Sequence, residues 1–138
     1  MNLFVFGLGY SSVHYIRKHA PDYDSIAGTV TTEKRKAELT ASGIKTYLFS
    51  DEGADDGIVE ALGEADIVLV SVPPGEAGDP VLAKFALPLT RSKRLRKIIY
   101  LSTVGVYGDR QGEWVDEATA PLTTNARSLM RLAAENLW

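Results

Sequence analysis

Two glycines near the start of the chain, Gly7 and Gly9, follow a short apolar segment that is typical of a buried strand. Glycine at both places lets the backbone turn sharply and lets a pyrophosphate approach it closely. Tyr10, Ser11 and Ser12 begin a predicted helix, and the free N–H groups of its first turn can hold phosphate oxygens. Ser12 stands where the dinucleotide-binding fingerprint prefers a third glycine or alanine. By itself, the motif fits either a cofactor-binding turn or a tight structural turn.

The composition excludes several classes of protein. The 138 residues are 45% hydrophobic and 24% charged, with a net charge of −3, as in ordinary globular domains. The basic run at 91–97 fits the end of a helix where positive side chains suit the dipole, so we expect no nucleic-acid partner. The absence of cysteine excludes disulfides, and His14 and His19 have no partner at ligand spacing, so we expect no metal. With no apolar run of transmembrane length and no signal-peptide pattern, we expect a cytoplasmic protein without membrane contact.

Apolar segments alternate with helical patterns along the chain. We expect strands at residues 3–6, 25–30, 45–49, 66–72 and 97–102. We expect helices after the glycine turn to about residue 20, and then over 33–42, 56–62, 79–93 and 125–138. Pro88 should kink or shorten the fourth helix. This order predicts an α/β fold of the Rossmann type, in which a doubly wound parallel sheet forms the middle of three αβα layers.

The ends of the predicted strands carry the residues that a ligand would need. Ligands of such sheets bind at the carboxyl ends of the strands, near the point where the strand order reverses. All five carboxyl ends are rich in Gly, Ser, Thr, Asp or Pro: 7–12, 29–32, 50–51, 72–75 and 102–107. Their agreement favours a dinucleotide site over a purely structural glycine turn.

The string Leu101–Asp109, LSTVGVYGD, resembles the short-chain dehydrogenase/reductase superfamily, and most closely its atypical extended members of the NAD-dependent epimerase/dehydratase type. It occurs together with the glycine turn and with a downstream Ala-Ala-Glu helix at 133–135. The resemblance covers essentially the whole chain. Extended members carry a further, mostly C-terminal region that closes over the substrate. We therefore expect a fragment, or an incompletely resolved longer chain, that lacks this region and could continue past Trp138.

The resemblance implies a role for several residues in holding the cofactor. The glycine turn with Ser12 would hold the pyrophosphate. Asp51, directly after the third strand, would hydrogen-bond the adenine amino group, and a loop cap is the alternative. Val72 and Pro73 would line the cofactor beside the fourth strand.

The identity of the cofactor depends on the second strand. An acidic residue about 20 positions after the glycines would bind the ribose 2′-OH of NAD. Here the segment up to Thr31 is neutral, and Lys34 and Arg35 follow it. Nearby cations without an acid favour a 2′-phosphate, so NADP is preferred over NAD. The alternative for both cations is a solvated helix surface.

At the substrate end, the resemblance implies catalytic positions at Thr103, which would polarise a carbonyl or hydroxyl, and at Tyr107, near the substrate pocket. A turn threonine and a packing tyrosine are the alternatives. The family's Tyr-x-x-x-Lys pair, in which lysine lowers the pKa of the tyrosine, aligns with Arg127 and Arg131. Arginine cannot replace that tyrosine as a proton carrier. The two arginines could hold an anionic substrate or phosphate instead, or form a solvated helix face.

Three functions follow from these observations. The first is an NAD(P)-dependent oxidoreductase or epimerase-like enzyme acting on a hydroxyl or carbonyl of a small molecule, for which a sugar is one option. The second is a non-catalytic NADP-binding sensor or regulatory protein. The third is an α/β domain with another ligand or none. A homodimer is consistent with the resemblance, although no sequence patch indicates an interface.

Overall fold

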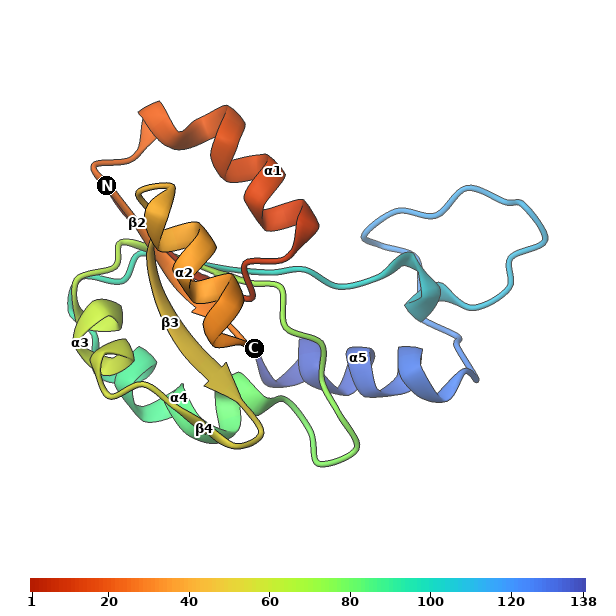
Figure 1. The fold of residues 1–138 in the computed structure, drawn as a ribbon. Coiled ribbons are helices and arrows are strands. Elements are labelled where there is room, and N and C mark those ends of the chain that lie inside the picture. Colours follow the sequence, from red (N-terminus) through yellow and green to blue (C-terminus); the bar gives the residue numbers. More distant parts are fainter.

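The alternation of strands and helices is present in the computed structural model, which describes residues 1–138 (Figure 1). The strands are β1 (Asn2–Phe6), β2 (Ser25–Val30), β3 (Lys45–Ser50), β4 (Gly53–Ala54), β5 (Ile67–Val70) and β6 (Lys97–Tyr100). The helices are α1 (Tyr10–His19), α2 (Glu33–Ala41), α3 (Gly57–Gly63), α4 (Pro80–Arg91) and α5 (Ala126–Leu137). Two 3₁₀ turns are η1 (Ala20–Asp22) and η2 (Val104–Tyr107).

The strands form one sheet in the order β4-β3-β2-β1-β5-β6. The chain builds outward from β1 to β3, then crosses back and places β5 on the other side of β1. The order therefore reverses between β1 and β5, which is where doubly wound sheets bind ligands. The predicted Rossmann-type fold is confirmed, with one correction. The sheet is not wholly parallel, because β4 pairs antiparallel with β3.

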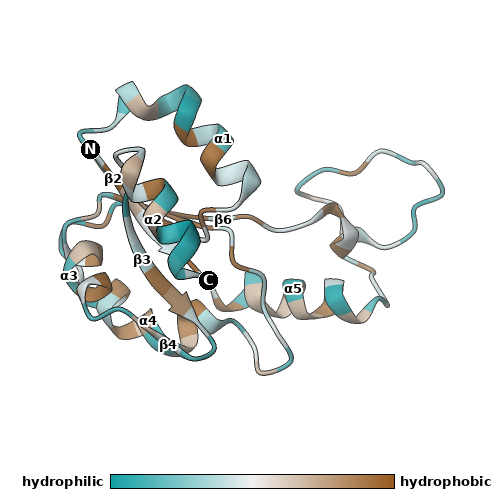
Figure 2. Ribbon diagram, in the orientation of Figure 1, coloured by the Kyte–Doolittle hydropathy of each residue, from teal (hydrophilic) through white to brown (hydrophobic).

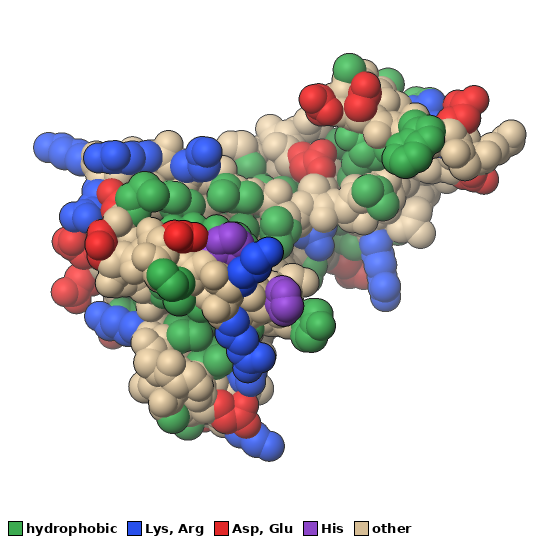
Figure 3. Space-filling view, turned by 90° about the horizontal axis from the view of Figure 1, so that it is seen from above, with side chains coloured by type: hydrophobic (Ala, Val, Ile, Leu, Met, Phe, Trp, Pro, Cys, Tyr) green, Lys and Arg blue, Asp and Glu red, His purple; other side chains and the backbone are tan.

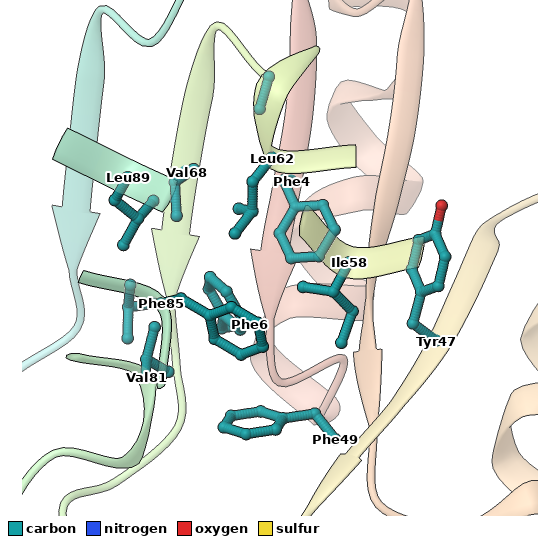
Figure 4. Close-up of a cluster of buried hydrophobic side chains, with 12 residues drawn as sticks. Phe4, Phe6, Tyr47, Phe49, Ile58, Leu62, Val68, Val81, Phe85 and Leu89 are labelled. Carbon is teal, nitrogen blue, oxygen red and sulfur yellow. The ribbon is translucent and has the colours of Figure 1, made fainter. Parts of the chain in front are cut away.

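The alternating side chains of β1 divide the core into two layers. Leu3 and Val5 point to the face covered by α1 and α2. Phe4 and Phe6 point to the opposite face, where they pack with residues of α3 and α4 (Figure 4). There the rings of Phe6 and Phe85 lie 5.3 Å apart, centroid to centroid. Each such buried side chain contributes about 1.5–3 kcal/mol. The coloured ribbon shows the apolar strands between mixed helices (Figure 2).

Several predicted boundaries are wrong by a few residues. β5 ends at Val70 and β6 at Tyr100, rather than at 72 and 102, because their ladders end where Phe6 pairs with Val70 and Val70 with Tyr100. The residues that follow these two strands therefore lie outside the ladders, at the carboxyl edge of the sheet. The segment predicted as a loop after β3 folds back as β4, which pairs with the end of β3. α4 continues through Pro88 to Arg91; Lys84, whose carbonyl loses its helical partner there, lies on an exposed face.

The amino edge of the sheet is held by Asp66. Its carboxylate accepts a hydrogen bond from the Asn2 backbone N–H at 2.7 Å, and Arg94 lies 3.3 Å from it. The Asn2 N–H, and then Arg94, hold the pKa of Asp66 below its ordinary value. Only Arg91 of the basic run at 91–97 lies in the last turn of α4, so the run is not simply a helix end. Arg94 and Arg96 approach Asp66 instead.

An extended loop, residues 108–125, projects from the sheet between η2 and α5 (Figure 1). In the space-filling view it forms an arm that carries several acidic side chains (Figure 3). α5 then returns to the sheet, where the Trp138 indole N–H donates to Asp79 at 2.8 Å. Trp138 also stacks on Tyr100, so the end of α5 is fixed against β6 and α4. No helix here has the combination of length and apolar character needed to cross a membrane.

Candidate functional site

The turn between β1 and α1 is fixed by Gly7. Its φ of 89° lies in the left-handed region that favours glycine, and a β-carbon there would lie 3.1 Å from Val72 Cγ2. The Gly7 N–H donates to Thr29 Oγ1 at 3.0 Å, and the Leu8 N–H donates to the Thr29 carbonyl at 2.8 Å. The turn is thus attached to the end of β2, and the turn and strand present one continuous edge.

Gly9 is glycine for a different reason. Its φ of −82° is available to any residue, and a β-carbon there would meet no protein atom within 4 Å. Gly9 is also the N-cap of α1, yet no side chain caps the helix. The backbone N–H groups of Tyr10, Ser11 and Ser12 therefore have no side-chain acceptor and lie at the positive end of a helix dipole. An anionic group can approach this backbone closely, and nothing in the protein itself requires the space.

Ser12 differs from its two neighbours. Tyr10 and Ser11 are exposed, but Ser12 is buried and its hydroxyl has no hydrogen-bond partner. The small side chain lets α1 pack close to the sheet, which is the function of the third glycine or alanine in the fingerprint. The unpartnered hydroxyl costs about 1–3 kcal/mol.

A cavity of about 370 Å³ lies at the carboxyl edge beside the turn. Four predicted cofactor residues line it: Gly7, Thr31, Asp51 and Val72. Sequence reasoning did not single out other lining residues, among them Thr29, Phe49, Ser50, Glu52 and Pro80. Asp51 is exposed here, so its carboxylate is accessible to a ligand.

Lys34 and Arg35 do not line this cavity. Both lie in the first turn of α2, which Thr32 caps by accepting a hydrogen bond from the Arg35 N–H. The Arg35 guanidinium lies 3.0 Å from Glu38, whereas Lys34 is exposed and makes no ion pair. Of the two cations, only Lys34 is thus without an acidic partner.

A second cavity, of about 660 Å³, lies beside α5. It brings together Pro73, Thr103, Arg127 and Arg131 from three separate segments. Sequence reasoning missed its other lining residues: Pro74, Asn125, Ser128 and Met130. Val72 lines the first cavity and Pro73 the second, so the segment after β5 borders both.

Thr103 lies in this second cavity as the N-cap of η2. Its Oγ1 accepts a hydrogen bond from the Gly105 N–H at 3.2 Å, so its own O–H remains available as a donor. A β-carbon at Gly105 would lie 2.7 Å from Ser128 Oγ, so glycine there allows η2 to approach α5 closely. Tyr107, at the other end of η2, is half-buried and does not line the cavity. The two predicted catalytic residues are therefore not brought together.

Arg131 is held in place by β6. Its Nη1 donates to the Leu101 carbonyl at 3.0 Å and to the Tyr100 hydroxyl at 3.3 Å, and its guanidinium lies over the Tyr100 ring. Burial raises the pKa of Tyr100, although Arg131 acts in the opposite direction. The phenol therefore stays protonated at neutral pH.

Some of the missed residues carried a recognisable signal. Thr29 stands in the polar segment 29–32 that ends the second strand, and Asn125 starts the last predicted helix and caps it, accepting from two N–H groups. Both follow from the rule that strand ends and helix starts meet at the ligand edge. For Ser128 and Met130, only the packing of α5 on η2 decides the position.

Comparisons with known proteins agree with this architecture. Protein YeeZ of Escherichia coli (strain K12) is 29% identical over 93% of this chain, and the chain spans about half (50%) of that curated relative. No protein-family model matches the chain.

Two of the solved structures that resemble this chain illustrate the likeness, and each covers 99% of it. One is a conserved protein of unknown function from Silicibacter pomeroyi DSS, with a TM-score of 0.82 and 36% identity, of which this chain covers 47%. The other, from Methylobacillus flagellatus, is named among NAD-dependent epimerase/dehydratases; it has a TM-score of 0.75 and 20% identity, and this chain covers 49% of it. These likenesses establish the Rossmann-type fold.

Proposed function

We propose that this chain is the NAD(P)-binding part of an oxidoreductase or epimerase-like enzyme that acts on a hydroxyl or carbonyl of a small, sugar-like molecule. The observation that carries the proposal is the open space beside Gly9, next to the uncapped first turn of α1 and at the reversal of strand order. The likeness to a protein named among NAD-dependent epimerase/dehydratases supports it.

The residues present fit a nicotinamide dinucleotide. The backbone from Gly7 to Ser12 would hold the pyrophosphate, and Asp51 would hold the adenine amino group. Val72 and Pro73 would border the path from the first cavity to the second. Lys34, with its free ammonium, would pair with a 2′-phosphate, which makes NADP the preferred form. When bound, the dinucleotide supplies or accepts the hydride.

At the substrate end, Thr103 would donate its free O–H to the reacting oxygen and so stabilise charge that develops there. Tyr107 remains the second catalytic candidate, reached only if its side chain turns towards the cavity. Arg127 and Arg131 stand at the places of the Tyr-x-x-x-Lys pair, and a guanidinium does not release its protons at neutral pH. Proton transfer would therefore use another group or water.

The same two arginines motivate a second candidate function, a non-catalytic NADP-binding sensor or regulatory protein. A site that binds the cofactor but lacks the usual proton carrier would bind NADP and NADPH without turning over. This candidate and the enzyme differ only in the hydride-transfer step.

Titration of the purified protein with NADPH and NADH side by side, followed by nucleotide fluorescence, tests the proposal. We expect saturable binding of both, with NADPH tighter. Absence of binding by either nucleotide at millimolar concentration would overturn the proposal. Absorbance of the nicotinamide, followed with a panel of sugar-like and other small carbonyl compounds, then separates the candidates. Turnover supports the enzyme, and tight binding without turnover on the whole panel supports the sensor.

A further inference from the structure

The polar side chains that line the cavity beside α5 all carry hydrogen-bond donors, and none is a carboxylate. Arg127 and Arg131 contribute two positive charges, and Thr103 has a free O–H. The Asn125 side-chain oxygen is occupied by the N–H groups of Arg127 and Ser128, which leaves its NH₂ group as a further donor. Donors of this kind suit a ligand that offers only acceptors and negative charge.

The two arginines lack acidic partners. They stand one helical turn apart, so they share a face of α5, where like charges repel. No Asp or Glu oxygen lies within 4.0 Å of either guanidinium; the arginines of the chain that make ion pairs are Arg35, Arg94 and Arg96. Glu135, one turn further along α5, does not line the cavity. Neither guanidinium is therefore in an ion pair with a carboxylate of the protein.

The pair is also partly preorganised. Arg131 is fixed by the Leu101 carbonyl and the Tyr100 ring through one of its terminal nitrogens, which leaves the other N–H groups of the guanidinium free. Arg127 is exposed and makes no side-chain hydrogen bond, so it can close on a ligand without breaking a contact. One fixed and one free guanidinium can together hold an oxyanion through paired N–H groups.

We propose that Arg127 and Arg131 bind an oxyanion, a carboxylate or a phosphate, carried by the substrate. Its assignment to the substrate rests on the proposed function, because Thr103 in the same cavity is the residue proposed to contact the reacting oxygen. The enzyme would then select small hydroxyl or carbonyl compounds that also bear an acidic group. At the positions where the family has its proton-transferring pair, the two arginines would instead determine which substrates bind.

Arginine side-chain NMR signals, followed during titration with sodium phosphate or sodium acetate at constant ionic strength, test this proposal. Sodium chloride serves as the reference. We expect a saturable shift of the Arg127 and Arg131 Nε–H signals with at least one oxyanion. Saturation by phosphate alone assigns a phosphate ester, and saturation by acetate assigns a carboxylate. Shifts that do not saturate, or that are the same for every exposed arginine, would overturn the proposal.

The Arg127→Gln variant should weaken oxyanion binding at least fivefold, because one of the two positive charges is lost. Its fold should stay intact, because the side chain is exposed. Arg91→Gln, at the exposed and unpaired end of α4, is the matched control and should change nothing. Arg131→Lys keeps the positive charge but loses the paired N–H donors of the guanidinium, and should also weaken oxyanion binding.

NADPH titration of the same variants separates this proposal from the proposed function. We expect Arg127→Gln to bind NADPH as the unchanged protein does. A parallel loss of NADPH affinity would assign the arginines to the cofactor and overturn the substrate assignment. If NADPH does not bind even the unchanged protein, while oxyanion binding is saturable, the proposed function is wrong but the two arginines still form an anion site.

Discussion

Two regions at the carboxyl edge of the sheet, the glycine turn and the cavity beside α5, are built in different ways. The glycine turn is formed by backbone: a glycine with positive φ, a second glycine that faces open space, and an uncapped helix start. The one beside α5 is formed by side chains, above all Thr103, Arg127 and Arg131. A backbone site can bind a group common to many ligands, whereas a side-chain site can change its chemistry by single substitutions. The difference fits a chain that keeps the glycine turn but has Arg127 and Arg131 at the places of the Tyr-x-x-x-Lys pair.

The largest expected effect falls in the side-chain cavity. Thr103→Val removes the O–H donor and should lower kcat about 100-fold in hydride transfer with a carbonyl substrate, because a donor to the developing charge is lost. Thr103→Ser, which keeps both the hydroxyl and the cap of η2, should retain most of the activity. Steady-state rates from nicotinamide absorbance provide the measurement. Equal rates for the Val and Ser variants would show that Thr103 acts only as a turn residue.

In the glycine turn, Gly9→Ala should weaken NADPH binding about 30-fold, since a methyl group in the ligand's space costs about 2 kcal/mol. The fold should be unaffected because a β-carbon there meets no protein atom within 4 Å. Gly63→Ala, at an equally open glycine at the end of α3, is the control. Fluorescence titration and thermal melting measure the two properties. Unchanged affinity in Gly9→Ala would mean that the open space is not the cofactor site.

A smaller effect should distinguish the two cations near the first cavity. Lys34→Ala should weaken NADPH binding about fivefold and leave NADH binding unchanged, because one exposed charge contributes about 1 kcal/mol to the affinity. Arg35→Ala should do less, since its guanidinium already pairs with Glu38 at 3.0 Å. Parallel titrations with the two nucleotides measure the difference. If Lys34→Ala weakens both nucleotides equally, Lys34 does not select the 2′-phosphate.

The smallest effect concerns the third position of the glycine turn. Ser12→Ala removes a buried hydroxyl without a partner, so the free energy of unfolding should rise by about 1 kcal/mol. NADPH affinity should stay within a factor of about two, because the backbone N–H groups remain. Urea unfolding measures the free energy of unfolding. A loss of stability in this variant would mean that the hydroxyl has a partner after all.

The sequence predicts the glycine turn better than the side-chain cavity. The turn, the strand ends and the caps at Thr32, Asp79 and Asn125 are local features, and each follows from neighbouring residues. Strand β4 was missed because its two residues carry no periodic signal, whereas β3 was predicted. The place of Tyr107 outside the cavity depends on how η2 packs on α5, which pairs residues far apart in the chain. Alternating apolar runs cannot specify such a contact.

The central position of β1 has a consequence for the order of folding. Its amino end is joined to Asp66, 64 positions away, while its partner on the other side begins at Ser25. During synthesis, the first strand to emerge can pair with β2 early, but its other edge stays unpaired until β5 has followed. Closing that long loop is entropically costly, so formation of the β1–β5 ladder should limit the folding rate. The crevice for the ligand exists only once this slow pairing is complete.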